Sequence, residues 1–300
     1  MSESLKTPNP ESGPLYAPET GFSLFIKLFI VPAVIVLVAL GIFFLGTMAL
    51  QHPKTAEQYL EELKSDNTSR RWQSAYELSR MLNQNEDIQF DPNLRTQLVQ
   101  VFGDAKNDDP RLREYLALVL GRLKEKSAVS VLSAAVREDG TDVKVYSLWA
   151  LGNIEDPQGG EAALDALSES DATVQRMAVG ALSAMRYEPA KFALEKNLDS
   201  VNPALRYDSA VALARLKDEK AMPTLLEMMN LKPSGKPEDD GMIQSAKITA
   251  IEGAKELPDA VLKDKIVDLS KNESDIKVRE TALAALKNSS PQRLRDTVKP

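Results

Sequence analysis

The chain has 300 residues, of which 43% are apolar but only 6% are aromatic, and its formal net charge is −7. An acidic surface repels polyphosphate, so we expect no nucleic-acid partner. The sequence has no cysteine, which excludes disulfides, thiolate metal sites and cysteine nucleophiles, and its single histidine, His52, excludes a zinc site built on several histidines. We therefore expect no catalytic residue, no metal site and no cofactor.

The N-terminal region contains a proline-rich tail followed by a long apolar run. Residues 1–21 carry four prolines among Ser, Glu and Gly, a composition typical of disorder. Leu28 to Leu50 are 23 residues without a charge. As a helix this run is about 34 Å long, enough to cross about 30 Å of bilayer hydrocarbon. The sequence predicts a single transmembrane helix within residues 22–51.

A cleaved signal peptide is the alternative interpretation of this run. The apolar core of a signal peptide is usually about 7–15 residues long and ends at an A-x-A-like site. The run here is longer, and residues 47–49 (Thr-Met-Ala) are a poor cleavage signal, so we favour an uncleaved anchor. Basic residues are slightly more numerous just after the run than before it. By the positive-inside rule this favours a single-pass membrane protein with the remainder of the chain on the cytoplasmic side.

An internal repeat fills residues 52–289. A matching apolar residue, here called the reference residue, recurs seven times, at steps of 42, 31, 31, 31, 38 and 35 residues: Leu78, Leu120, Leu151, Leu182, Leu213, Ile251 and Leu286. Eleven residues before each reference residue stands a type favoured at helix N-caps: Asn67, Asp109, Gly140, Asp171, Asn202, Asp240 and Asp275. The pattern predicts seven helices, the B helices, that begin after these caps.

Further helices, the A helices, are predicted between the B helices. Apolar residues at helical spacing place five of them at residues 127–137, 160–168, 189–198, 220–230 and 260–271. One A–B hairpin cannot bury its own apolar face, but stacked hairpins form a continuous core. The sequence therefore predicts an all-α fold: a transmembrane helix, an α-solenoid of about seven helical hairpins at 52–289, and a C-terminal tail at 290–300.

The amino-acid pattern of the repeat resembles that of a known family. The pattern Asp-x-x-Val-Arg-x-x-Ala-x-x-Ala-Leu-Gly is visible in Asp109–Arg113 and in Asp275–Leu286. Residues 55–289 thus resemble the HEAT family, particularly its short, phycobilisome-lyase-like form. The resemblance implies an α-solenoid. It also suggests an alternative function, that of a chromophore lyase or a lyase subunit.

A row of polar residues, one in each B helix, falls on the apolar side of these helices that faces the core. Seven residues before each reference residue lie Arg71, Arg113, Lys144, Gln175, Arg206, Gln244 and Arg279. The HEAT resemblance implies that such side chains form a ladder between repeats, in which each one is hydrogen-bonded. We expect the ladder to be structural, and a ligand role for this row is the weaker alternative.

The face of the B helices opposite the core is unusually rich in aromatic residues, although it should be the face most exposed to solvent. We predict that this face lines the concave groove of the solenoid, with Trp149 largely accessible to solvent. The predicted protein-binding residues are Trp72, Tyr76, Tyr115, Leu118, Tyr146, Trp149, Met177 and Tyr207. The alternative is that neighbouring helices cover these side chains.

These patterns predict a non-enzymatic scaffold or adaptor at a membrane. Its groove would hold a peptide or helix of another protein in a membrane complex. Two insertions lengthen the repeat, at Asn83–Asn93 and Leu231–Gly241. The acidic run Glu238–Asp240 in the second lacks the alternating ligands of a calcium loop, and we expect it to be solvated.

Overall fold

The computed structural model describes residues 22, 25–50, 54–84 and 90–288. The tails predicted at residues 1–21 and 290–300 lie wholly outside the described residues. The chain divides into two compact units, Met1–Lys54 and Thr55–Pro300, and each unit is described by itself.

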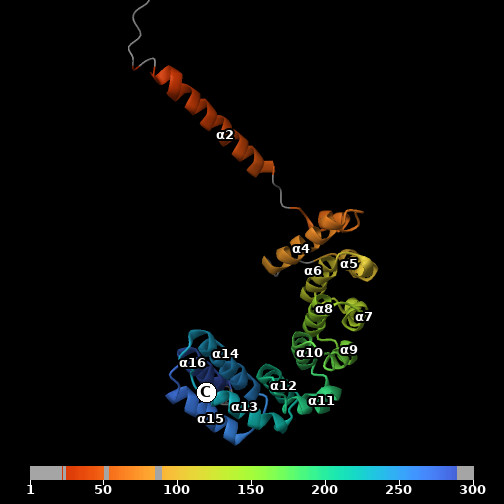
Figure 1. Cartoon of the computed structure of the whole chain (residues 1–300), viewed down its shortest axis with the longest axis vertical. Helices are drawn as coiled ribbons and strands as arrows, with labels where there is room; N and C mark the ends of the chain where they lie inside the picture. Colours follow the sequence, from red (N-terminus) through yellow and green to blue (C-terminus); the bar gives the residue numbers. More distant parts are fainter. Residues whose placement is uncertain (1–21, 23–24, 51–53, 85–89, 289–300) are drawn as a thin grey trace, which may run out of the picture. The chain divides into compact units, whose positions relative to one another are not determined.

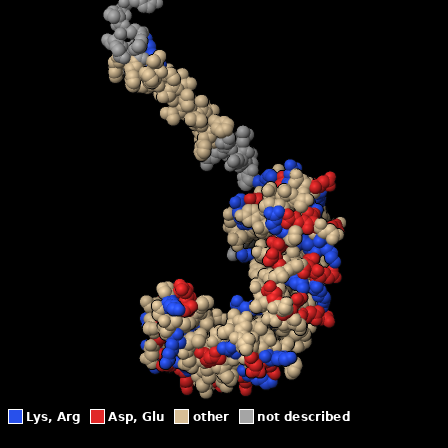
Figure 2. All heavy atoms as spheres, viewed as in Figure 1, with Lys and Arg blue, Asp and Glu red and all other residues tan. Residues whose placement is uncertain are grey.

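The described part of the first unit is one apolar helix. It opens with a π-helical turn, η1 (Ile26–Ile30), and continues as α2 (Val31–Leu50), with Pro32 in the first α-helical turn. Lys27–Leu45 is long and apolar enough to cross a membrane, and none of this stretch is buried. Figure 2 shows an uncharged surface along this helix beyond Lys27. The predicted apolar helix is confirmed, and both a membrane anchor and a signal sequence have these properties.

The described residues of the second unit form seven helical hairpins, as the repeat predicted. The pairs, A helix first, are α3 (Ala56–Leu63) with α4 (Thr68–Gln84), α5 (Pro92–Asp104) with α6 (Pro110–Arg122), α7 (Val129–Glu138) with α8 (Thr141–Ile154), α9 (Gly160–Ala166) with α10 (Ala172–Ala184), α11 (Lys191–Asn197) with α12 (Pro203–Arg215), α13 (Met222–Met229) with α14 (Pro237–Ala254), and α15 (Ala260–Asn272) with α16 (Ile276–Asn288). The described residues contain no strand.

The hairpins stack into two layers. Each B helix from α4 to α16 packs on the B helix of the next hairpin, and A helices such as α7 and α9 form the second layer. Within the solenoid, the B helices line the concave side and the A helices the convex side (Figure 1). The first six reference residues have no exposed surface, which confirms the register, whereas Leu286 in the last hairpin is half-buried.

Six of the seven predicted N-caps lie directly before their B helices. Side-chain oxygens of the predicted cap residues cap five of these helices. For example, the Asp171 carboxylate accepts hydrogen bonds from the amides of Thr173 and Val174 at 2.8 and 3.1 Å. The prediction for Asp240 is wrong, because α14 begins three residues earlier, at Pro237. Proline suits the first position of a helix. The acidic residues that follow it are stabilised by the positive N-terminal end of the helix dipole. The second insertion is correspondingly shorter than predicted.

Four consecutive links from a B helix to the next A helix, from α6 to α13, repeat a left-handed residue. Lys124, Glu155, Arg186 and Lys217 all have positive φ, between 48° and 59°, and they follow one another at steps of 31 residues. The next A helix then opens with a 3₁₀ turn, as at Lys126–Ala128 before α7. Three of these turns supply the first residues of the A helices predicted at 127–137, 189–198 and 220–230. In the first long link, residues 85–89 lie outside the described structure.

Glycine permits a close contact between the B helices α6 and α8. A methyl group added to Gly121 of α6 would lie 2.8 Å from the Cα of Ala150 and 2.8 Å from the Trp149 ring, both on α8. Such distances are shorter than any ordinary carbon contact. The absence of a side chain at Gly121 therefore lets α6 and α8 approach, and it creates the surface on which Trp149 rests.

Candidate protein-binding face

The concave side of the first three B helices carries an aromatic cluster. The Trp72 ring of α4 stacks with the Tyr115 ring of α6, with centroids 6.5 Å apart. The Tyr76 ring meets Tyr115 edge-on at 5.2 Å. Tyr76 is exposed, at 41%, whereas Trp72 and Tyr115 are half-buried and pack on the core. The structure thus brings three of the predicted residues into direct contact.

Trp149 is more buried than the sequence suggested. The expectation of a largely accessible side chain is wrong: the residue is half-buried, and its ring packs over Gly121. Its position on the helix was predicted correctly, but the distance between α6 and α8 was not. One edge of the ring contacts the neighbouring helix, and the remainder contributes to the concave surface.

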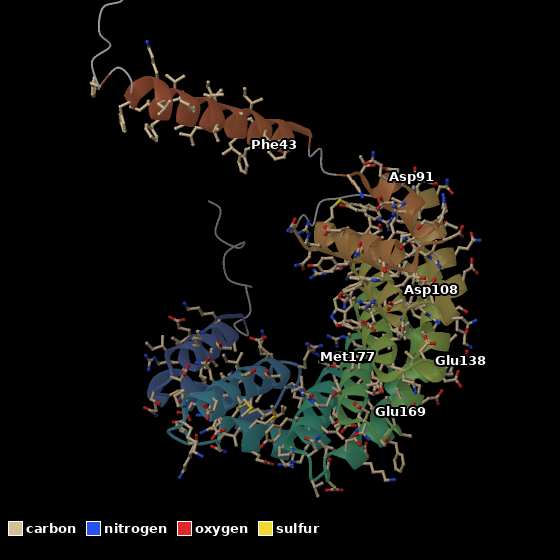
Figure 3. All side chains as sticks on the ribbon, turned by 45° about the horizontal axis from the view of Figure 1, so that its top comes forward. Phe43, Asp91, Asp108, Glu138, Glu169 and Met177 are labelled. Atoms are coloured by element: carbon tan, nitrogen blue, oxygen red, sulfur yellow. The ribbon has the colours of Figure 1, made fainter. Side chains whose placement is uncertain are left out.

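The other predicted residues extend this face unevenly. Leu118, Tyr146 and Met177 are half-buried on α6, α8 and α10, and Figure 3 places Met177 on the concave side. Tyr207 of α12 is set apart, because its hydroxyl donates a hydrogen bond of 2.9 Å to Glu227 on the A helix α13. We define the aromatic face as the predicted residues without Tyr207: Trp72, Tyr76, Tyr115, Leu118, Tyr146, Trp149 and Met177.

Two arginines contact this face, and the sequence analysis did not identify either. The Arg111 guanidinium lies 4.1 Å from the centroid of the Trp72 ring. The Arg122 guanidinium lies 5.8 Å from the Trp149 ring and donates a hydrogen bond to Asn83 at 2.6 Å. Arg111 lies nine residues before the reference residue Leu120, and Arg122 lies two residues after it. Helical periodicity places both positions on the concave side, so the sequence contained a signal that could have identified them. Figure 2 shows charges concentrated instead along the convex side, over α5, α7 and α9.

The polar row forms the predicted ladder. Its most buried member, Arg113, forms an ion pair of 3.0 Å with Asp139, in the turn before α8 of the next hairpin. Their side chains are only 6% and 11% exposed, and the guanidinium also lies 4.5 Å from the Phe102 ring. Burial raises the pKa of Asp139 above its ordinary value, although Arg113 opposes this shift.

The other members of the row all find hydrogen-bond acceptors in their own or the next hairpin. Arg71 pairs with Asp108, Lys144 with Glu169 and Gln244 with Asp275, each in the turn of the next hairpin. Gln175, Arg206 and Arg279 bond to carbonyl groups of their own turns, and Arg206 also pairs with Glu227 at 2.8 Å. Figure 3 shows Asp108 and Glu169 away from the concave side that carries Met177.

The last two hairpins are joined by a second buried ion pair. Lys247 of α14 and Glu273, in the turn before α16, are 2.7 Å apart, and both side chains are 8% exposed. Burial opposes ionisation of Glu273, but hydrogen bonds from Lys247, the Asp275 amide and Ser274 outweigh it and lower its pKa. This pair adds a second contact beside the ladder.

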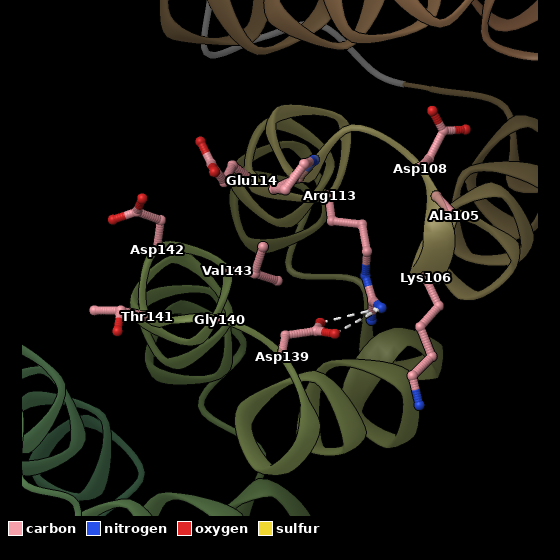
Figure 4. Close-up of a pocket in the computed structure, with 11 residues that line it drawn as sticks. Ala105, Lys106, Asp108, Arg113, Glu114, Asp139, Gly140, Thr141, Asp142 and Val143 are labelled. Carbon is pink, nitrogen blue, oxygen red and sulfur yellow. Dashed lines mark hydrogen bonds and ion pairs between the residues drawn. The ribbon is translucent and has the colours of Figure 1, made fainter.

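A small cavity lies between the turn before α6 and the start of α8 (Figure 4). Its volume is about 230 Å³, and four carboxylates and two bases are among its lining residues. The pair formed by Arg113 and Asp139 lies inside, whereas Glu114 and Asp142 point away from this pair. Burial raises the pKa of Glu114, and the neighbouring carboxylate of Asp142 adds to the shift.

The described residues contain no group of three or more His, Cys, Asp or Glu residues arranged to hold a metal ion. In the acidic run after the second insertion, Asp240 accepts a hydrogen bond of 2.7 Å from the Ser234 amide. Asp239 accepts one of 3.2 Å from the Ser234 hydroxyl. These carboxylates therefore hold the start of α14 against the preceding loop.

The comparison with protein families decides what kind of solenoid this is. The family described as HEAT repeats matches residues 160–236, which include α9 to α13. Residues 160–236 thus match HEAT repeats, and the other hairpins repeat the same two-helix unit. No curated protein matches the sequence.

Solved structures share the fold of these HEAT repeats. One is the complex of CpcE and CpcF of phycocyanin lyase from Nostoc sp. PCC7120, with 15% identity, 80% of this chain and 97% of that chain covered, and a TM-score of 0.53. Another is YibA of Escherichia coli, with 16% identity, 78% and 81% covered, and a TM-score of 0.52. At these identities the similarity concerns the fold.

Proposed function

We propose that the protein is a membrane-anchored, non-enzymatic scaffold that binds another protein through the aromatic face of its HEAT solenoid. The apolar helix at Lys27–Leu45 is the membrane anchor in this proposal. The observation that carries the binding function is the cluster of Trp72, Tyr76 and Tyr115, which joins two adjacent B helices on the concave side. Aromatic side chains that keep an accessible surface are typical centres of protein interfaces.

The polar ladder supports a separation between residues that stabilise the stack of hairpins and residues that bind the partner. Its side chains are bonded within and between hairpins, so they stabilise the stack and leave the concave side for recognition. The concave side of a solenoid offers an extended surface to a peptide or helix. The partner in this proposal is a protein segment of that kind, within a membrane complex and on the cytoplasmic side.

Crosslinking in detergent-solubilised membranes tests this function. The full-length chain should capture one protein reproducibly, and the variant Tyr76→Ala/Trp149→Ala should lose it. Phe192→Ala is a matched control, because Phe192 is an aromatic residue on the A helix α11 and is 78% exposed. Equal capture by all three proteins would exclude the aromatic face as the binding site.

A chromophore lyase subunit is the second candidate. It is favoured by one observation, the similarity over 97% of a chain in the structure of the phycocyanin lyase complex of CpcE and CpcF. An antenna protein among the captured partners, together with covalent transfer of a chromophore to it, would support this candidate. Capture of a partner that receives no chromophore would favour the scaffold.

A further inference from the structure

The charges beside the aromatic face are not balanced. Six charged residues line the cavity near α6 and α8, and four of them form ion pairs. Arg113 and Asp139 pair with each other, Asp108 pairs with Arg71, and Lys106 pairs with Glu138. Glu114 and Asp142 remain, and within the described part of the chain neither has a hydrogen bond or an ion pair. Arg111, on the same helix as Glu114, is held by Asp109 through bonds of 2.9 and 2.5 Å.

The two unpaired carboxylates lie next to two tyrosines. Burial raises the pKa of Tyr146, and the next causes of the shift are Glu114, Tyr115 and Asp142. Glu114 and Tyr115 are adjacent on α6, and Asp142 and Tyr146 are four residues apart, on one face of α8. Because α6 packs on α8, these four side chains share one locality. Figure 4 shows Glu114 and Asp142 directed to the same side, away from the pair formed by Arg113 and Asp139. Glu114 is half-buried and Asp142 is exposed, and Arg111, the base that attracts Glu114, is already paired with Asp109. Two neighbouring carboxylates of which one is half-buried are unfavourable, and a cation supplied by a partner would relieve this cost.

We propose that this part of the aromatic face binds a cationic side chain of the partner segment, and an arginine in preference to a lysine. The carboxylates of Glu114 and Asp142 would accept hydrogen bonds from the guanidinium, while the rings of Tyr115 and Tyr146 contact its plane. The inference rests on the proposed binding function and specifies the chemistry of the partner.

The face already holds a guanidinium of the chain itself. Arg111 lies over the Trp72 ring at 4.1 Å, on the same concave surface. A planar guanidinium combines stacking on aromatic rings with paired hydrogen bonds to carboxylates, whereas an ammonium acts as a point charge. A divalent metal ion is a poorer occupant, because the described residues offer no group of three or more acidic, His or Cys ligands.

Binding of a fluorescent octa-arginine peptide to the full-length protein in detergent tests the inference. The variant Glu114→Gln/Asp142→Asn removes two charges with little change in side-chain size. Glu161→Gln/Asp264→Asn is the control, because it removes the same charge from exposed positions on the A helices α9 and α15. We expect the first variant to bind about tenfold more weakly than the wild type, and the control to bind within about twofold.

Equal weakening in both double variants would show that the peptide responds only to the overall negative charge, and would overturn the inference. An undetectable interaction with the wild type would overturn it as well. In either case the proposed scaffold function is judged separately, by capture of a protein partner in the wild type and its loss in Tyr76→Ala/Trp149→Ala.

An octalysine peptide and the variant Tyr146→Leu test the role of the rings. The wild type should bind octa-arginine at least threefold more tightly than octalysine, and Tyr146→Leu should remove most of this preference. Equal affinity of the wild type for both peptides would contradict stacking of a guanidinium on the tyrosines.

Discussion

Arg113 and Arg206 occupy the same position of the repeat but differ in burial. The pair of Arg113 and Asp139 is almost wholly enclosed, whereas Glu227, the partner of Arg206, is 45% exposed. Removing one member of a buried pair leaves the other charge without compensation, which costs about 3–5 kcal/mol.

We therefore expect Arg113→Ala to lower the free energy of unfolding by about 3 kcal/mol, and Arg206→Ala by about 1 kcal/mol or less. Urea denaturation followed by circular dichroism measures both. Partner binding should be unchanged once each variant is folded, since the ladder lies away from the aromatic face. Loss of binding with unaltered stability would instead give the ladder a role in recognition.

Glu273 links the stability of the last hairpins to pH. Its pKa in the folded protein lies below the ordinary value of 4.5. The ionised carboxylate therefore contributes stability that is complete above about pH 4.5 and is lost as the pH falls through the folded-state pKa. The contribution of Asp139 to the pH dependence of stability has the opposite sign, because the pKa of Asp139 is raised in the folded protein.

The variant Lys247→Met isolates the contribution of Glu273. At pH 7 it should be less stable than the wild type by about 3 kcal/mol, because Glu273 becomes a buried charge without a partner. At about pH 3 the difference should shrink or reverse, because the protonated carboxyl no longer needs the lysine. Urea denaturation at both pH values gives the two differences, and equal values would show that the pair does not control this pH dependence.

The sequence predicted which side chains share a face, but not how deeply each is buried. The register placed Trp149 and Tyr115 on the concave side because helical periodicity depends only on spacing. The burial of Trp149 depends on a contact with Gly121, 28 residues earlier, and no local pattern encodes that contact. Glu114 and Asp142 occupy different positions of the repeat, so no pattern pointed to them, and their lack of ion-pair partners follows only from where the neighbouring bases lie.

At the scale of the helix, Gly121 and Gly180 form an informative pair. A methyl group at Gly121 of α6 would meet the backbone of α8 at 2.8 Å, whereas one at Gly180 of α10 would meet nothing within 4 Å. Both lie inside helices, where alanine is intrinsically favoured over glycine by about 1 kcal/mol.

We expect Gly121→Ala to destabilise the solenoid by about 1–3 kcal/mol, because α6 and α8 must move apart. Gly180→Ala should stabilise it by about 0.5–1 kcal/mol. Thermal unfolding of both variants measures the difference, and stabilisation by Gly121→Ala would show that the two helices can separate without cost.

Helix boundaries were predictable where one cap residue acts alone. Asp109 and Asp171 were identified by type and spacing, and each caps its helix. At α14 only Asp240 was predicted as the cap, and the helix instead begins at Pro237, because proline suits the first helical position. The left-handed turns at residues such as Lys217 had no glycine to indicate them.

For the whole molecule, the sequence predicted the number and order of the hairpins. Recurring apolar residues at a step of 31 in the central repeats are sufficient for this, because each hairpin must bury its face on the next one. The curvature and the depth of the concave surface depend on small rotations between repeats, which spacing does not encode. Membrane attachment depends on the apolar helix and is tested separately.

If residues 22–51 form an uncleaved anchor, alkaline carbonate should leave the full-length protein in the membrane pellet. A chain that starts at Lys54 should be soluble and helical, since the solenoid forms a compact unit from Thr55. Immunoblots of the pellet and the supernatant measure this distribution. A mature N-terminus near Leu50 would instead identify the apolar helix as a cleaved signal sequence.

The affinity of the captured partner for the full-length protein tests the central claim most directly. Tyr76→Ala and Trp149→Ala should each weaken binding by about 2 kcal/mol or more, as expected of aromatic residues near the centre of an interface. Tyr76→Ala should have little effect on stability, whereas Trp149→Ala should cost about 1–2 kcal/mol, less than a fully buried tryptophan. Phe192→Ala, on the convex side, should leave the affinity unchanged. If Phe192→Ala weakens binding while the two concave variants do not, the aromatic face is not the binding site.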